Sequence, residues 1–173
     1  MTEPQSEHVR LAMKATESYI RDHNKIKVPE DTSEELRTKQ AGVFVCIKIA
    51  GELRGCIGTI EPCCNSLAEE IINNAISACS KDPRFALVSP NELPQLEYTV
   101  DVLTEPEPID TLDQLDPKRY GVIVTSGYKK GLLLPDLEGV DTVEYQVSIA
   151  MQKAGIGRGE AVRLQRFEVL RYH

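Results

Sequence analysis

The residues best suited to chemistry lie in one seven-residue stretch, Leu53-Arg54-Gly55-Cys56-Ile57-Gly58-Thr59. If this stretch is a strand, its side chains alternate, and Arg54 and Cys56 share one face with Gly58. A guanidinium about 7 Å from the sulfur favours the thiolate, which is the nucleophilic form of cysteine. Glycines inside a strand are typical of a bulge, or of close approach by a ligand or a second backbone. The stretch therefore predicts a reactive thiol in an anion-binding recess.

A second interpretation gives the same residues structural roles. Cys56 would be a small buried hydrophobe, Arg54 would form a salt bridge, and the glycines would bend a sheet. Free cysteine is among the most buried residue types, so the residues alone leave both interpretations open. The catalytic candidates are Cys56, as nucleophile or redox centre, and Glu97, as a more weakly supported base. The ligand-binding candidates come from the same stretch and one later arginine: Arg54, Gly55, Gly58, Thr59 and Arg84.

The five cysteines, at positions 46, 56, 63, 64 and 79, do not follow the spacing of a disulfide framework. Their odd number favours a reducing compartment, and we expect a cytoplasmic protein. Cys46 is predicted to be a core residue. Cys63 and Cys64 are either resolving thiols for an oxidised Cys56 or unpaired loop cysteines. Zinc and iron–sulfur spacings are absent, so the sequence indicates no metal site and no cofactor.

Composition excludes several classes of function. A chain of 173 residues with 41% hydrophobic and 27% charged residues is typical of one globular domain. Its formal net charge of −7 disfavours nonspecific nucleic-acid binding, which depends on Lys and Arg. Residues 1–5 lack the pattern of a signal peptide, and no apolar run has the length that crosses a bilayer. We therefore expect neither membrane insertion nor nucleic acid as a partner.

Hydrophobic periodicity predicts the elements that must position these residues. Helices are expected after Ser6, over 34–38, after Ser66 and from the capping-box segment Asp141-Thr142-Val143-Glu144, with capping residues at their starts. Strands are expected over 42–49, 53–59, 96–102, 121–125, 131–134 and 163–172, the first two forming one hairpin and 121–134 another. The polar face of 96–102 is either solvated or lines a cleft. Only in a cleft could Glu97 do acid–base work.

Five segments together resemble one known family. They are the 53–59 stretch, Asn74-Ala75, Asp82-Pro83-Arg84-Phe85, the run from Gly131 to Pro135, and Lys153-Ala154-Gly155. They are similar to the AMMECR family, whose archaeal and bacterial members are called AmmeMemoRadiSam system protein A, with RGCIG as its signature. The resemblance covers nearly the whole chain, as a single AMMECR-type domain over 1–173.

The resemblance implies an α+β fold with an antiparallel β-sheet flanked by helices, a second smaller lobe, and a cleft between the lobes near the signature. Through gene context it also implies association with a Memo-type protein and a radical S-adenosylmethionine enzyme. It carries no established reaction, and the chain is not assigned as an enzyme on this basis.

Three functional hypotheses follow. In the first, the chain is an accessory subunit of the radical-enzyme system, and Arg54, Cys56 and Arg84 face a cleft that binds a small anionic ligand or a partner segment. In the second, it is a thiol-dependent enzyme that uses Cys56 as nucleophile or redox centre. In the third, it is a regulatory factor acting on nucleic acid, which its acidic charge disfavours.

Overall fold

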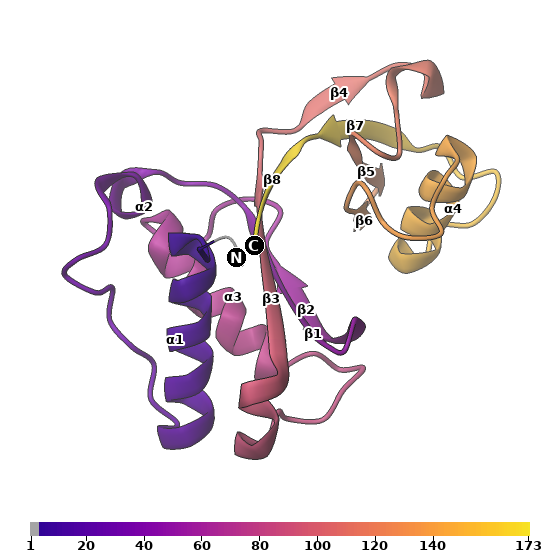
Figure 1. The fold of residues 1–173 in the computed structure, drawn as a ribbon. Coiled ribbons are helices and arrows are strands. Elements are labelled where there is room, and N and C mark those ends of the chain that lie inside the picture. The colour runs from indigo at the N-terminus through magenta and orange to yellow at the C-terminus, as the bar shows by residue number, and fades with distance from the viewer. Residues whose placement is uncertain (1–3) are drawn as a thin grey trace. The chain divides into compact units, whose positions relative to one another are not determined.

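The computed structural model describes residues 4–173, and their contacts divide the chain into two units (Figure 1). Unit 1 contains the chain up to Leu103 together with Leu170–His173, and unit 2 contains Thr104–Val169. Each unit has its own four-stranded sheet. The chain therefore passes between the units twice, at 103–104 and at 169–170.

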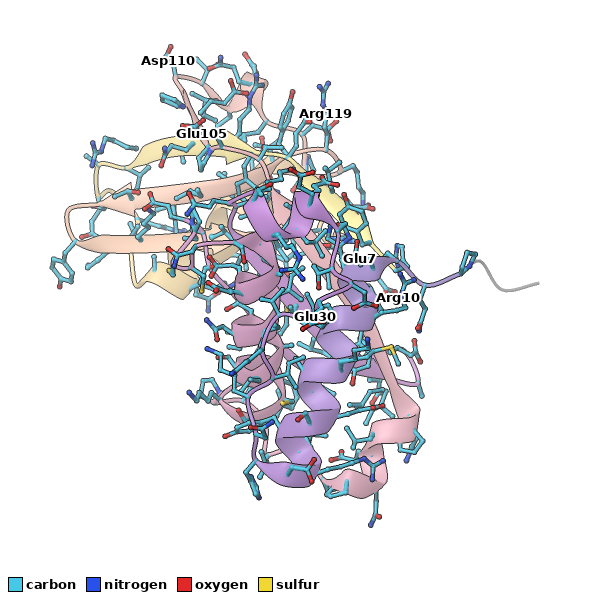
Figure 2. All side chains as sticks on the ribbon, turned by 90° about the vertical axis from the view of Figure 1, so that its left-hand side faces the viewer. Glu7, Arg10, Glu30, Glu105, Asp110 and Arg119 are labelled. Atoms are coloured by element: carbon cyan, nitrogen blue, oxygen red, sulfur yellow. A yellow bond between two sulfur atoms is a disulfide. The ribbon has the colours of Figure 1, made fainter. Side chains whose placement is uncertain are left out.

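Three helices belong to unit 1: α1 (Glu7–Asp22), α2 (Glu34–Thr38) and α3 (Leu67–Ser80). The two long helices begin at serines whose hydroxyls accept a backbone N–H three residues later, Ser6 from Val9 and Ser66 from Glu69. Both helices lie on the same side of the sheet (Figure 1) and face the viewer in Figure 2, and their buried apolar residues form one core with the sheet. The helices thus cover one face of the unit 1 sheet.

The sheet of unit 1 has the order β2-β1-β3-β8, from β1 (Val43–Ile49), β2 (Glu52–Gly58), β3 (Leu96–Leu103) and β8 (Val169–Tyr172). The short 3-10 helix η1 (Pro90–Gln95) leads into β3. Pairing of β1 with both β2 and β3 is antiparallel. Val43, Val45 and Ile47 on β1 are fully buried beneath the helices. The alternate residues, including Cys46, point to the opposite face, which carries no helix of unit 1, and β2 is an edge strand.

Unit 2 has the sheet order β4-β7-β5-β6, from β4 (Glu107–Ile109), β5 (Gly121–Ser126), β6 (Lys129–Leu133) and β7 (Arg163–Phe167). It also contains the short 3-10 helix η2 (Leu112–Gln114) and α4 (Val143–Ala154). Thr142 caps the start of α4, and Gly155 ends it in the left-handed conformation, with φ of 71°. The apolar face of α4 packs on Val122 and Val124 of β5 in a separate small core.

The α+β class with antiparallel sheets flanked by helices is confirmed, but the prediction for the last strand is wrong. Residues 163–172 form two strands in different sheets, β7 and β8, with a break at Glu168. The N–H of Glu168 donates to the Thr104 hydroxyl, and its carbonyl accepts from the Thr104 N–H. Strand β4 was not predicted because it has only three residues and contains Pro108.

Within residues 4–173, every helix is too short or too polar to span a bilayer.

His8 in α1 gives a testable pH dependence of stability. Its ring stacks on Tyr172 of β8 with centroids 3.7 Å apart, and its buried Nε2 has no hydrogen-bond partner within residues 4–173. Burial lowers the pKa of His8 below its usual 6.5, against smaller opposing effects of Glu35 and Glu7. The unfolded chain therefore binds a proton at His8 before the folded protein does, and stability falls as the pH drops below about 6.5.

His8→Phe keeps an aromatic stack but removes the titrating group. We expect its unfolding free energy to decrease less than that of the wild type between pH 7 and pH 5. Urea unfolding at a series of pH values measures this, with His173→Phe as a control because the His173 side chain is exposed. A His8→Phe protein that retains the wild-type slope contradicts the assignment.

Candidate functional site

The signature strand β2 contains a bulge. Ile47 lies opposite Gly55, whereas Lys48 lies opposite Leu53, so Arg54 is an extra residue without a partner on β1. The strict alternation assumed from the sequence fails at Arg54. Without the bulge, Cys46 would lie opposite Gly55. The extra residue shifts the register by one position and places Cys46 opposite Cys56.

Cys46 and Cys56 form a disulfide between β1 and β2. Their Cα atoms are 4.1 Å apart, which is typical of a non-hydrogen-bonded antiparallel pair, where side chains are closest. Both residues are half-buried on the helix-free face. In this state Cys56 is not a free thiol. The prediction that Cys46 is simply a core residue was wrong.

The other three cysteines are free: Cys63 is exposed, Cys64 is half-buried and Cys79 is buried. Neither loop cysteine is the partner of Cys56. Burial raises the pKa of the Cys79 thiol to about 11, with the Arg54 charge opposing part of this rise. Within residues 4–173, no three His, Cys, Asp or Glu side chains converge in an arrangement that could hold a metal ion.

Arg54 is fully engaged by the segment that follows α3. Its Nε and Nη2 donate to the two carboxylate oxygens of Glu92 at 2.9 and 3.1 Å, and its Nη1 donates to the Ala86 carbonyl at 2.9 Å. The side chain is 16% exposed. These hydrogen bonds from Arg54, with the Ser89 N–H, lower the pKa of Glu92 to about 2. Arg54 therefore has the salt-bridged role of the structural interpretation, and its charge is compensated within unit 1.

Asp82 and Arg84 pair with the backbone of Cys56 at the free edge of β2. Oδ2 of Asp82 accepts the Cys56 N–H at 3.0 Å, and Nη2 of Arg84 donates to the Cys56 carbonyl at 3.4 Å. The two side chains also bond to each other, from Nε at 3.0 Å and from Nη2 at 2.8 Å. This ion pair thus occupies the position that a neighbouring strand would take, which protects the edge.

The Asp82 carboxylate is almost fully buried, with 2% of its side chain exposed. Hydrogen bonds from the Arg84 side chain lower its pKa to about 2, and the backbone N–H groups of Cys56 and Arg84 contribute further. Arg84 differs from its partner because 55% of its side chain is exposed, and its guanidinium carbon lies 5.5 Å from the centroid of the Phe85 ring. Arg84 is thus the more accessible of the two arginines predicted to bind a ligand.

The remaining ligand-binding candidates have packing roles in the structure. A Cβ at Gly55 would overlap the carbonyl oxygen of Ala78 in α3, and a Cβ at Gly58 would overlap the Phe44 ring. The Thr59 hydroxyl accepts a hydrogen bond from the Asn74 amide at 3.2 Å. The glycines therefore allow close approach of a helix and a ring. Ligand binding by these residues stays a prediction.

The structure does not bring Glu97 next to Cys56. Glu97 is exposed and lies opposite Lys48, on the far side of β1 from β2. Thr99, rather than a carboxylate, is the β3 residue opposite Cys46. No proton acceptor suited to a nucleophilic Cys56 comes from this strand. Asp101, the other acidic residue of β3, accepts two hydrogen bonds from Arg171 at 2.8 Å.

Sequence reasoning missed three residues that organise this region: Cys46, Asp82 and Glu92. Their partners are 10, 26 and 38 residues away in the chain. The one available signal was the position of Asp82 two residues before Arg84, a spacing that allows the aspartate to bind the guanidinium and the backbone N–H together.

The two depressed carboxylates predict acid sensitivity. Asp82 and Glu92 have ordinary pKa values of 3.8 and 4.5, and both fall to about 2 in the folded protein. Their stabilising contribution is present above pH 4.5 and is lost as the pH falls through 2, because the unfolded chain takes up protons first. It amounts to on the order of 2 kcal/mol for each carboxylate.

We expect Glu92→Gln to reduce the slope of unfolding free energy against pH between 4.5 and 2, measured by denaturant unfolding. Glu52→Gln, which changes an exposed residue on the same strand as Arg54, is the matched control. Equal slopes in the two variants would show that the Arg54–Glu92 ion pair does not contribute to the pH dependence of stability.

Comparison with known proteins supports the family resemblance. The AMMECR1 family model matches residues 9–173. A protein from Thermotoga maritima is 50% identical over 167 residues, covering 95% of this chain and 96% of that protein. The crystal structure of the uncharacterized protein PH0010 from Pyrococcus horikoshii has a TM-score of 0.88 and 34% identity, covering 95% of this chain and 88% of that one.

Protein CA_C1420 from Clostridium acetobutylicum is 50% identical over 166 residues, which is 95% of this chain. The match covers 35% of that relative, so this chain spans about a third of its length. Together the family match, the relatives and the solved structure show that the chain belongs to the AMMECR1 family.

Proposed function

We propose that the chain is an accessory module that binds a segment of a partner protein at the β2 edge of unit 1. The surface that supports this proposal, called here the edge surface, consists of Leu53, Arg84, Phe85 and Leu87. The observation that carries it is the exposure of two large apolar side chains, Leu53 at 39% and Leu87 at 52%, on two segments of which the second also carries the exposed Arg84. Exposed apolar residues grouped around an arginine are typical of protein-binding surfaces.

Hydrogen bonds hold the parts of the edge surface together. Arg84 binds the Cys56 carbonyl, and the Ala86 carbonyl accepts from Arg54. The 84–87 segment therefore lies along the edge of β2, with Leu53 immediately before the bulge. These contacts present the apolar side chains on an ordered backbone, which lowers the entropic cost of binding.

The charges favour a partner segment with a carboxylate over a free anion. Arg54 is neutralised by Glu92, which leaves Arg84 as the cation on the edge surface. Nη1 of Arg84 makes no hydrogen bond within residues 4–173, although Asp82 occupies Nε and Nη2. One partly compensated guanidinium supports weak anion binding by itself. A surface that offers this guanidinium together with two exposed leucines suits an acidic and apolar peptide segment.

The partners that we propose are a Memo-type protein and a radical S-adenosylmethionine enzyme in the cytoplasm, as the family's gene context implies. The Clostridium relative supports a function within a larger assembly, because about two thirds of its length lies outside the matching region. In that protein an AMMECR1 region is covalently joined to further polypeptide.

Anoxic co-purification of the tagged chain with each proposed partner tests the proposal. We expect the wild type to retain at least one partner, and the double variant Arg84→Glu, Leu87→Ser to lose most of the retention. The control is Arg158→Glu, Leu112→Ser, which changes an exposed arginine and a leucine of similar exposure in unit 2. A wild-type chain that retains neither partner contradicts the proposal, as does equal loss in the control.

A second candidate function uses the thiol of Cys56, and the disulfide with Cys46 is the observation that favours it as a redox rather than a nucleophilic centre. A nucleophilic role needs that bond to be reduced first. In the reduced protein, iodoacetamide should then modify Cys56 faster than the exposed reference thiol Cys63 at pH 7, as judged by mass spectrometry. Slower modification of Cys56 excludes an activated nucleophile.

A further inference from the structure

We propose that Cys46–Cys56 is a redox-active disulfide that exchanges with a dithiol reductant, and that its reduction loosens the β2 edge. This inference rests on the second candidate function, the redox role of Cys56, and does not depend on docking at the edge surface. It rests on three observations: the accessibility of the pair, the hydrogen bonds made by the Cys56 backbone, and the position of Cys56 on an edge strand.

Accessibility comes from the helix-free face of the unit 1 sheet. Helices α1 and α3 cover the opposite face, where Val45 and Ile47 are fully buried. Both cysteines remain half-buried, in contrast to Cys79, which is 1% exposed. Exchange requires a thiolate to approach a sulfur of the disulfide, and exposed disulfides are the ones that exchange most readily.

The Cys56 backbone links the disulfide to the segment after α3. Its N–H donates to Asp82 and its carbonyl accepts from Arg84, so the residue that carries the sulfur also anchors the first part of the 82–88 segment. The disulfide ties this anchor to β1. Once the bond is broken, Cys56 is held only by strand pairing and by these two side chains. The edge then opens locally more often, while the β1–β3 pairing is unaffected.

The exchange balances as a two-electron reduction. A thiolate of the dithiol attacks Sγ of Cys56, which is the sulfur on the edge strand, and forms a mixed disulfide while the bond to Cys46 breaks. Cys46 leaves as a thiolate and takes up a proton. The second thiolate of the reductant then attacks the reductant sulfur of the mixed disulfide. This step releases Cys56 as a thiolate, which is protonated in turn. The dithiol is oxidised to its cyclic disulfide, and the protein gains two thiols.

Redox titration of the native protein tests the exchange. The protein is equilibrated with mixtures of reduced and oxidised dithiothreitol, alkylated and digested, and the modified cysteines are assigned by mass spectrometry. We expect Cys46 and Cys56 to become modified together while circular dichroism stays native. The exposed Cys63 serves as the positive control, modified in every mixture, and the buried Cys79 as the negative control.

The local effect is measured by amide hydrogen exchange of residues 82–88. We expect about a tenfold increase in their exchange rate on reduction, and the same increase in Cys46→Ser, Cys56→Ser without any reductant. Exchange in α4, in unit 2, should not change. The serine variant separates loss of the bond from side effects of the reductant.

The order of attack has its own test. The oxidised wild type is treated briefly with reduced glutathione, a monothiol, and then alkylated, and we expect glutathione to be found on Cys56 and the alkyl group on the released Cys46. The reverse labelling overturns the assignment of Cys56 as the attacked position. The proposal as a whole is overturned if Cys46 and Cys56 become modified only when the protein unfolds, or if exchange of 82–88 is the same in both redox states. Neither result bears on partner retention, so the docking proposal is judged separately.

Discussion

Replacing Gly55 with alanine is expected to lower the free energy of unfolding by about 3 kcal/mol, the upper range for overpacking a core. A Cβ at this position would overlap the Ala78 carbonyl oxygen in α3. The oxygen belongs to the backbone and the position of a Cβ is fixed by the backbone, so neither can move aside by a change of rotamer. Strand β2 and helix α3 would have to separate, and the contact that closes the core at this edge would be lost.

Urea unfolding compares Gly55→Ala with Gly157→Ala. The control position is open, because the nearest atom to a Cβ there is Glu160 Oε2 at 3.7 Å, and we expect a change within about 0.5 kcal/mol. Similar effects in the two variants would mean that close approach of β2 and α3 is not the reason for glycine in the signature.

Removal of the Asp82 carboxylate is the second change that we expect to lower the free energy of unfolding strongly. In Asp82→Ala the Cys56 N–H loses its acceptor, and the Arg84 guanidinium loses the partner that holds it along the strand. Because the carboxylate is buried, we expect a loss of about 3 kcal/mol in unfolding free energy. Arg84→Ala should cost less, about 1 kcal/mol, because the guanidinium is half-exposed and water can replace part of its contacts.

Urea unfolding measures the loss of unfolding free energy in Asp82→Ala and in Arg84→Ala. Asp31→Ala, which removes a carboxylate at an exposed turn, is the control. If Arg84→Ala is the more destabilising change, the carboxylate does not act mainly as acceptor for the strand backbone.

Most secondary structure could be predicted from the sequence because its signals are local. Ser6, Ser66 and Thr142 each bond an N–H three residues later, and the apolar stripes that follow have helical spacing. The hairpin turn at Ala50-Gly51 is also local, with both residues at positive φ. Strand pairing across such a turn follows from its length, provided that no residue is inserted.

The candidate site could not be predicted to the same extent, because one inserted residue changes it. The bulge at Arg54 places Cys46 opposite Cys56, and no local pattern indicates where a bulge will form. The pairings of Arg54 with Glu92 and of Cys56 with Asp82 bring together residues far apart in the chain. The sequence singled out Arg54 and Arg84, but not Glu92 and Asp82, the carboxylates that pair with them.

These pairings change the interpretation of the signature. An arginine and a cysteine in one strand suggested a thiolate beside a free positive charge. The structure instead has a disulfide, one neutralised arginine, and a second, half-exposed arginine whose guanidinium lies beside the Phe85 ring. Such a surface is better suited to contact with a polypeptide than to binding a small anion.

The most direct test of the docking proposal is amide hydrogen exchange of the oxidised chain with and without the Memo-type protein from the same organism. The account predicts protection concentrated in residues 52–58 and 82–88, and its loss in Arg84→Glu, Leu87→Ser. Complex formation with protection elsewhere and none in these two segments would contradict it, as would the absence of any protection at saturating partner concentration.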